Sequence, residues 1–458
     1  MIGWLIERME KRADREAIVQ GGRTFTFGEL LREFERGLAG LRVRRVKPGE
    51  IVAVIGDYSP AACGWLLALA ANGNTIVPLT AAAKPREREL AELGGVDRLF
   101  ELNESGPVRF ESFDRPVKHD LLARLRDRGT PGLVLFTSGT TGTPKGIVHD
   151  MAKFLEKYKT ERESLRTLTF LLFDHIGGLN TLFHTLANGG TVVCPSGRSP
   201  QEVCEAIERY RVELLPASPS FLNWMLLTDA CRARDLSSLK MITYGTEAMA
   251  EPTLNRLREA LPRVQLRQTY GLSELGILRA KSMSSGSLWV RVGGEGFETK
   301  VVDGILHIRA ESAMEGYLNA ESPFDEEGWF NTQDRVLVDG DYIRILGRQS
   351  EIINVGGRKV YPAEVEEVLM GMPEIADVLV KGEPNPLMGQ IVAAVVNAAA
   401  PADAKLLKAK IREYCADKLE PYQVPVKIRL QSEPLYSERF KKVRSQAAPA
   451  PVRKGGGG

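Results

Sequence analysis

A length of 458 residues predicts about two to four folding units, because one domain usually holds roughly 100 to 200 residues. Hydrophobic residues make up 43%, and the 61 Lys and Arg nearly balance the 59 Asp and Glu, which is typical of a globular protein and disfavours nucleic acid or a membrane as partner. The five cysteines form no C-x-x-C pair and the five histidines lack metal-ligand spacing, so we expect no structural zinc and a reduced, cytoplasmic protein.

Two apolar stretches near the N-terminus do not predict insertion into a membrane. The start, MIGWLIERMEKRADREA, is amphipathic and charged from the seventh residue, so it lacks the apolar centre of a signal peptide. The segment AACGWLLALAANGNTIVPL is interrupted by Gly and Asn before it reaches the length of a bilayer span.

Short apolar runs alternate with helical patterns through the first 260 residues or so. This order predicts an α/β core with mostly parallel sheets, in which ligands bind beyond the carboxyl ends of the strands. The expected strands are 50–56, 132–138, 168–173, 190–195 and 239–245, and expected helices are 199–212 and 250–261.

The pattern changes near residue 286 to short strands with turn residues between them. The tripeptide VDG occurs twice between apolar runs, which predicts two β-hairpins. A further hairpin with Gly356-Gly357 at its turn and a helix from Pro362 begin a small α+β domain. We therefore expect an N-terminal core at 1–348, a C-terminal domain at 349–445 and a disordered tail at 446–458.

The segment TSGTTGTPKG, residues 137–146, gathers hydroxyl side chains and glycines beside Lys145. Exposed backbone N–H and side-chain O–H donors in such a loop suit a polyanion such as a chain of phosphates. The spacing is not that of a Walker loop, which needs Gly-Lys-Ser/Thr after four residues.

This loop closely resembles the phosphate-binding loop of the adenylate-forming superfamily, which includes acyl-CoA synthetases, adenylation domains and luciferases. Further segments match that family in its order: ITYGTEAM, QTYGLSE, GWFNTQDRV and ILGRQSEIINVGGRKVYPAEVEEVL. The resemblance implies an N-terminal part of several subdomains, with mostly parallel sheets plus a distorted β-barrel, followed by a mobile α+β C-terminal domain.

The resemblance implies a site for ATP and Mg²⁺. Donors of the loop and Lys145 would hold the β and γ phosphates, and Glu274 would coordinate Mg²⁺, which prefers oxygen ligands. Tyr270 would offer a flat face to adenine, and Gly271 would let backbone approach the ligand. The implied nucleotide residues are Thr137, Ser138, Gly139, Thr140, Thr141, Gly142, Lys145, Gly245, Thr246, Glu247, Tyr270, Gly271, Ser273, Asp334 and Arg348.

Asp334 is expected to accept hydrogen bonds from the ribose hydroxyls, assisted by Arg348. Gln333 stands where the family usually has Gly, a departure that would alter the local backbone. A turn residue without a ligand is the alternative for Asp334.

The family's catalytic lysine corresponds to Lys441, counted back from Arg444 in EPLYSERFKKVRSQ. Phe440 replaces the family's Gly, and one extra residue follows Pro434. Lys442 and a merely solvated basic face are the alternatives. Ser350 occupies the hinge position, where a small polar residue can absorb the backbone rotation that brings the Gly356-Gly357 turn toward a pantetheine arm.

The segment FLLFDHIGGLN resembles the acid-pocket segment of fatty-acyl and aryl-CoA ligases. Amino-acid-activating domains carry an Asp where this chain has Ile176, so an α-amino acid would lack a counter-ion; Asp174 keeps that alternative open if the alignment shifts. The expected pocket residues are His175, Ile176, Asn180, Phe221, Tyr244 and Ile277. His175 is also a candidate catalytic residue, with a packed core histidine as the alternative.

The resemblance implies an acid–thiol ligase that uses ATP, Mg²⁺ and CoA to convert a small-molecule carboxylic acid, fatty or aryl, to an acyl-adenylate and then a thioester. An enzyme that loads the phosphopantetheine of an acyl or peptidyl carrier protein, or an amine, shares the first step. A degenerate nucleotide-binding protein is the third hypothesis. No nucleic acid and no stable membrane insertion are expected.

Overall fold

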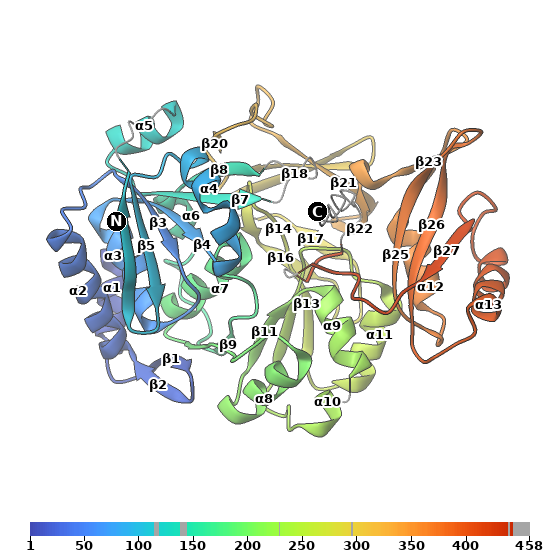
Figure 1. The fold of residues 1–458 in the computed structure, drawn as a ribbon, viewed down its shortest axis with the longest axis horizontal. Helices are drawn as coiled ribbons and strands as arrows, with labels where there is room; N and C mark the ends of the chain where they lie inside the picture. The colour runs from blue at the N-terminus through green and yellow to red at the C-terminus, as the bar shows by residue number, and fades with distance from the viewer. Residues whose placement is uncertain (114–118, 138–143, 229, 295, 438–439, 443–458) are drawn as a thin grey trace, which may run out of the picture. The chain divides into compact units, whose positions relative to one another are not determined.

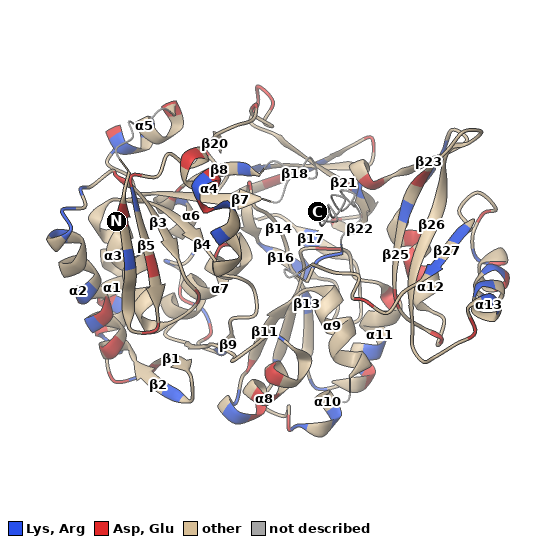
Figure 2. Ribbon diagram, viewed as in Figure 1, with Lys and Arg blue, Asp and Glu red and all other residues tan. Residues whose placement is uncertain are grey.

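The computed structural model describes residues 1–113, 119–137, 144–228, 230–294, 296–437 and 440–442. Two compact units form, one from residues 1–137 with 145–346 and one whose described part is residue 144 with 347–437 and 440–442. Among the described residues no helix is long and apolar enough to cross a membrane. Acidic and basic residues are interspersed on surface helices such as α8 (Pro200–Tyr210), in keeping with the net charge of +2 (Figure 2).

The first unit contains a seven-stranded sheet in the order β13-β12-β11-β9-β10-β1-β2. Every pairing is parallel except β1 with β2, which form a hairpin. The bounds are β1 Glu16–Gln20, β2 Arg23–Thr26, β9 Arg166–Leu168, β10 Thr191–Val193, β11 Leu214–Ala217, β12 Met241–Tyr244 and β13 Gln265–Gln268. The accompanying helices are α8, α9 (Pro219–Leu227), α10 (Ala230–Ala233) and α11 (Glu251–Ala260).

A second seven-stranded sheet has the order β20-β8-β7-β4-β3-β5-β6 (Figure 1). Its centre is parallel, whereas β8, β20 and β6 add antiparallel edges. The bounds are β3 Ile51–Ile55, β4 Thr75–Leu79, β5 Arg98–Asn103, β6 Gly106–Ser112, β7 Gly132–Thr137, β8 Lys145–Asp150 and β20 Gly316–Tyr317. Thr137 pairs with Lys145 across β7 and β8, so these strands hold both ends of the expected phosphate loop.

Helices pack against the sheets in two hydrophobic cores. The helices at 87–93 and 120–127 lie in a core with strands of the second sheet, whereas the other helices given below share one core with strands of both sheets. The shared core includes Ile18 of β1, Val54 of β3 and Leu179 of α7, each at most 1% exposed. The helices are α1 Gly3–Glu10, α2 Phe27–Val43, α3 Pro60–Asn72, α4 Glu87–Leu93, α5 Asp120–Asp127, α6 Met151–Glu156 and α7 Ile176–Ala187, with a 3-10 turn at Ala81–Arg86.

Residues 280–348 form a six-stranded sheet in the order β16-β17-β22-β21-β19-β18, and each of the pairings β16–β17, β17–β22, β19–β21 and β18–β19 is antiparallel. The turns at Asp303-Gly304 and Gly340-Asp341 confirm the two predicted hairpins. The bounds are β16 Ala280–Ser282, β17 Val290–Val292, β18 Phe297–Val302, β19 Ile305–Ala310, β21 Phe330–Asp339 and β22 Tyr342–Arg348.

The second unit is a small α+β structure. A long hairpin of β25 and β26 is flanked by the β23–β24 hairpin and by β27, which runs parallel to β26. Gly356 and Gly357 lie at the β23–β24 turn with φ of 57° and 82°, as the sequence predicts. The bounds are β23 Ile353–Val355, β24 Arg358–Val360, β25 Ile375–Asn385, β26 Gly389–Ala398, β27 Lys427–Leu430, α12 Pro362–Met370 and α13 Ala404–Ala416.

One predicted strand is wrong in its extent. The run 168–173 was expected to be extended throughout, but the strand there is Arg166–Leu168 and the chain then bends toward α7. The bend brings the backbone of Leu172 and Gly178 close together: a Cβ at Gly178 would meet the carbonyl oxygen of Leu172 at 1.9 Å.

Helices α2 and α3 approach each other through glycine. A Cβ at Gly64 would lie 2.6 Å from the carbonyl carbon of Glu33 and 2.8 Å from the backbone nitrogen of Phe34. Backbone atoms cannot swing aside as a flexible side chain can, so the space is strictly limited.

We therefore expect Gly64→Ala to lower the free energy of unfolding by about 1–3 kcal/mol, because overpacking outweighs the better helix propensity of Ala. Gly3→Ala in α1 is the control, since its Cβ would meet nothing within 4 Å. Urea unfolding measures both; equal stability of the two variants would contradict the close packing.

Candidate active site

The YGLSE segment forms a tight antiparallel hairpin. Strand β14 (Tyr270–Leu272) pairs with β15 (Gly276–Leu278), and Gly271 lies opposite Ile277. A Cβ at Gly271 would come within 2.7 Å of the Ile277 side chain. Glycine is therefore required here by the partner strand, in addition to any approach by a ligand.

A buried histidine joins this hairpin to the strand that follows the phosphate loop. His149 of β8 is 1% exposed, and its Nε2 lies 2.7 Å from the carbonyl oxygen of Ser273. A carbonyl only accepts, so Nε2 carries the proton and donates. Burial lowers the pKa of His149 to about 4, so the ring is neutral at pH 7. Sequence reasoning missed this residue, because one histidine in an apolar strand resembles a packed core residue.

Glu274 and Lys145 both contact Tyr317, one at its hydroxyl and the other at its ring. The Tyr317 hydroxyl donates to Glu274 Oε1 at 2.7 Å, and Lys145 Nζ lies 4.9 Å from the centroid of the Tyr317 ring. The backbone N–H of Met314 donates to the Glu274 carbonyl at 2.7 Å. The structure therefore places a cation and a carboxylate together beside the end of the phosphate loop.

The Glu274 carboxylate fits a Mg²⁺ ion that is shared with a nucleotide. Its side chain is partly exposed, and Oε2 makes no hydrogen bond within the described residues. These residues contain no cluster of three or more His, Cys, Asp or Glu that could hold a metal ion. Mg²⁺ in nucleotide enzymes uses one or two carboxylates plus phosphate oxygens and water, so a single carboxylate suits that role.

Asp334 is held in place by Tyr270. The Tyr270 hydroxyl donates to Asp334 Oδ2 at 2.5 Å, and the Asp334 N–H donates to the Thr332 hydroxyl at 3.0 Å. Asp334 is 6% exposed. The residue before it, Gln333, has φ of 62°, so glutamine adopts the left-handed conformation that glycine favours. The backbone at Gln333 therefore keeps the left-handed conformation that a Gly at this position would favour, and the expected change of the local backbone is not seen.

The GTE loop after β12 is strained. Gly245 has no room for a Cβ, which would lie 2.6 Å from the Thr269 hydroxyl, and Thr246 has φ of 75°. A β-branched residue at positive φ is rare and costly. Glu247 accepts the Ser220 N–H at 2.7 Å through Oε1. Backbone strain at a predicted nucleotide loop is typical of a binding site.

His175 is the N-cap of α7. Its Nδ1 accepts the N–H of Gly177 at 3.1 Å, which leaves Nε2 as the nitrogen that faces other groups. The side chain is half-buried. It therefore combines a helix-capping role with the pocket position that the sequence predicts.

Of the remaining predicted pocket residues, three are buried and two are partly exposed. Phe221, Tyr244 and Ile176 are at most 2% exposed, and Phe221 packs on Phe170 with ring centroids 4.1 Å apart. Asn180 and Ile277 keep accessible surface.

Lys157 links Asn180 and Ile277, and no sequence pattern predicts this link. Its Nζ donates to Asn180 Oδ1 at 2.7 Å and to the Ile277 carbonyl at 2.9 Å. Burial lowers the pKa of Lys157 to about 7, with the charge of Arg162 adding to the effect. Its partners are 23 and 120 residues away, so no local pattern could reveal it.

The second unit distinguishes the two candidate lysines. Lys442 Nζ donates to Glu366 Oε2 at 3.1 Å and to the Val378 carbonyl at 2.7 Å, and lies 3.7 Å from Asp377 Oδ1. Phe440 has φ of 51°, the conformation that the family's Gly would favour, and Lys441 follows it directly. The ammonium of Lys442 is therefore held by acceptors of the second unit itself.

Two more predicted residues lie at the end of β22 and just after it. Arg348 ends β22 and Ser350 lies in the exposed turn Gln349–Glu351. Outside the described residues are Ser138, Gly139, Thr140, Thr141 and Gly142.

We expect Gln333→Gly to keep or raise the free energy of unfolding by up to about 1 kcal/mol, because glycine relieves the left-handed backbone and the exposed glutamine side chain is lost at little cost. Gln333→Val should lower it by about 1–2 kcal/mol, since a β-branched residue is strained at positive φ. Urea unfolding compares the two variants. Equal stability of both would contradict the backbone assignment.

Comparisons with known proteins agree with this geometry. A family profile described as AMP-binding enzyme matches residues 5–318, and one described as AMP-binding enzyme C-terminal domain matches residues 364–439. An indoleacetate–CoA ligase of Aromatoleum aromaticum is 30% identical over 84% of this chain and 86% of its own length. A 2-succinylbenzoate–CoA ligase of Bacillus licheniformis is 27% identical over 92% and 94%.

Solved structures show the same fold. The anthranilate CoA ligase AuaEII, solved with anthranoyl-AMP, has a TM-score of 0.82 at 22% identity and covers 96% of this chain and 95% of its own. The amide bond synthetase McbA from Marinactinospora thermotolerans has a TM-score of 0.76 at 22% identity, covering 96% and 98%. The fold, the two profile matches and the full-length relatives together place this chain in the family of AMP-binding enzymes.

Proposed function

We propose that the protein is an acid–thiol ligase that activates a carboxylic acid, preferably an aryl acid, with ATP and then transfers the acyl group to CoA. The observation that carries this proposal is the arrangement of Lys145, Tyr317 and Glu274 beside the end of the phosphate loop, in the same unit as the Tyr270–Asp334 pair. Relatives named for indoleacetate, 2-succinylbenzoate and ferulate support an aryl acid.

In the first step a carboxylate oxygen of the acid attacks the α-phosphorus of ATP. The bond from that phosphorus to the oxygen that bridges the β-phosphate breaks, and pyrophosphate leaves with the electron pair. Lys145 and the loop donors would offset the charge of the β and γ phosphates, and Asp334 would hold the ribose. Glu274 would hold a Mg²⁺ ion, which supplies charge neutralisation when bound.

In the second step the sulfur of CoA attacks the carbonyl carbon, the bond from that carbon to AMP breaks, and the thiol proton passes to solvent. We expect Ser350 to serve as the hinge between the two steps. We place the enzyme in the cytoplasm, where ATP and CoA are available, and its five cysteines are free thiols.

A carrier-protein thiol or an amine is the second candidate acceptor. A fatty acid–[acyl-carrier-protein] ligase of Streptomyces coeruleorubidus is 29% identical over 84% of this chain, and the amide bond synthetase shares the fold. Both alternatives keep the first step unchanged.

We expect ATP–pyrophosphate exchange with aryl acids such as indoleacetate and ferulate to exceed exchange with α-amino acids by at least about tenfold, since a buried ammonium would lack a counter-ion. Mass spectrometry with CoA, a holo carrier protein or an amine identifies the acceptor. ATP binding without exchange for any acid would instead support a degenerate nucleotide-binding protein.

We expect Lys441→Ala to reduce pyrophosphate exchange by about 100-fold or more, because the lysine would stabilise the charge at the reacting phosphate. Thioester formation from synthetic acyl-adenylate should change only a few-fold.

Lys442→Met is the matched comparison for Lys441→Ala. It should lower the free energy of unfolding by about 3 kcal/mol, because Glu366 and Asp377 lose their cation. Equal loss of both half-reactions in Lys441→Ala would contradict the assigned role of Lys441.

A further inference from the structure

Lys157 occupies the C-terminal end of α6 and reaches into the predicted acid pocket. Two of its three N–H groups go to Asn180 Oδ1 and the Ile277 carbonyl. Both acceptors are neutral, so the ammonium is desolvated without a counter-ion among the described residues. The side chain keeps some accessible surface, which leaves the third N–H able to bind a ligand.

The groups around Lys157 supply no negative charge. Arg162 is a cation that disfavours the lysine's charge. Burial, with a smaller contribution from the positive charge of Lys157, lowers the pKa of His184 and of His149 to about 4, so both rings are neutral at pH 7. Burial raises the pKa of Tyr158 well above its ordinary value, and its hydroxyl stays protonated. The site is therefore cationic.

The amide of Asn180 adds further donors. Its Oδ1 accepts from Lys157 at 2.7 Å and from the Tyr158 hydroxyl at 2.8 Å. An ammonium has no lone pair, so the amide orientation is determined by Lys157, and Nδ2 must point to the other side. Asn180 Nδ2 makes no hydrogen bond within the described residues. Lys157 and Asn180 thus present N–H donors that lack an acceptor.

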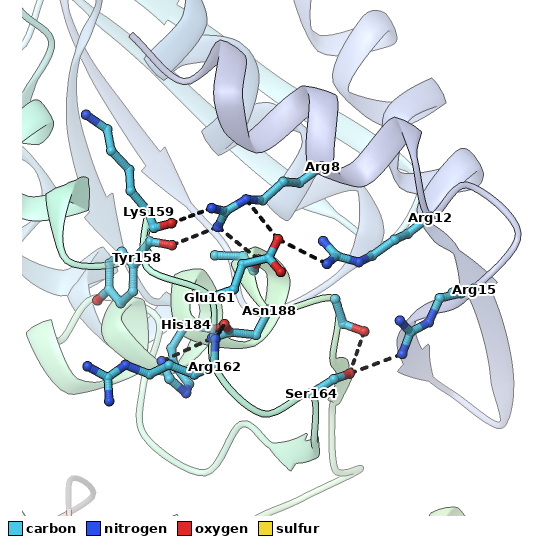
Figure 3. Close-up of polar contacts among 12 residues, drawn as sticks. Arg8, Arg12, Arg15, Tyr158, Lys159, Glu161, Arg162, Ser164, His184 and Asn188 are labelled. Atoms are coloured by element: carbon cyan, nitrogen blue, oxygen red, sulfur yellow. Dashed lines mark hydrogen bonds and ion pairs between the residues drawn. The ribbon is translucent and has the colours of Figure 1, made fainter.

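The segment that carries Lys157 is anchored from the first helix. Arg8 of α1 donates to the carbonyls of Tyr158, at 3.0 Å, and Lys159 (Figure 3). Its Nε lies 3.3 Å from Glu161 Oε1. These contacts hold the chain after α6, so Lys157 is a rigidly placed cation and not a mobile surface lysine.

We propose that Lys157 binds a second acidic group of the substrate, remote from the carboxylate that is adenylated, so that the preferred acids carry two anionic groups. This proposal rests on the proposed function, since it concerns the acid that the enzyme activates. A desolvated ammonium gains far more from a buried anion than from neutral acceptors. Asn180 would donate to the same group.

Matched pairs of acids test the proposal by pyrophosphate exchange: phenylacetate with para-carboxyphenylacetate, and octanoate with octanedioate. At pH 6.5 we expect the diacid of the productive pair to have kcat/KM about 10- to 100-fold above its monoacid. Lys157→Met should remove that advantage by lowering the kcat/KM of the diacid far more than that of the monoacid, while Lys157→Arg should restore part of it.

Lys159→Met is the control variant, because Lys159 is 49% exposed and pairs only with Glu156 across one helical turn among the described residues. The pH dependence of kcat/KM for the diacid is a second test, because a lysine with a purely structural role would not change it. The diacid stays ionised above pH 6, so its kcat/KM should fall as pH rises through about 7, where Lys157 loses its proton. The monoacid should show no such fall.

The outcomes are distinct. Equal kcat/KM for both members of each pair, or an equal loss for both in Lys157→Met, would overturn the role of Lys157 and leave the ligase function intact. Exchange with none of the four acids by the unmodified enzyme would count against the proposed function and, with it, this inference.

Discussion

The hydrogen bond from His149 to the Ser273 carbonyl is the constraint on which the nucleotide side of the site depends. It ties the strand that leaves the phosphate loop to the turn that carries Glu274. Because the imidazole is buried and neutral, it links the two segments without adding a charge beside a polyanion. The Tyr317–Glu274 and Tyr270–Asp334 bonds then extend the same region toward the sugar.

The acid side is organised differently. Its centre is a charged group held by neutral acceptors, and the polar contacts around it come from α6, α7 and β15. The segments of the nucleotide side resemble those of the family, whereas Lys157 is the residue that we propose for the selection of the acid. The segments proposed to bind ATP and the residue proposed to select the acid therefore lie on separate elements of one unit.

Much of the fold could be predicted from local patterns. The apolar runs around Ile51–Ile55 and Met241–Tyr244 and the VDG turns became the expected strands and hairpins, because burial and turn geometry act over a few residues. The run after Leu168 was mispredicted, since the tight approach of Gly178 to Leu172 is a tertiary effect. His149 and Lys157 escaped prediction for the same reason: their partners are more than 20 residues away.

The contact of Arg8 has a consequence for the order in which the protein is made. The first helix emerges from the ribosome early, yet its arginine binds a carbonyl 150 residues further along the chain. Leu5 and Met9 of α1 share a core with α2, which follows soon after in the chain, but the Arg8 contact cannot form until the later segment is synthesised, and closing so long a loop costs entropy. The anchor of the segment that carries Lys157 is thus completed only when the N-terminal helix meets a part of the chain that is made much later.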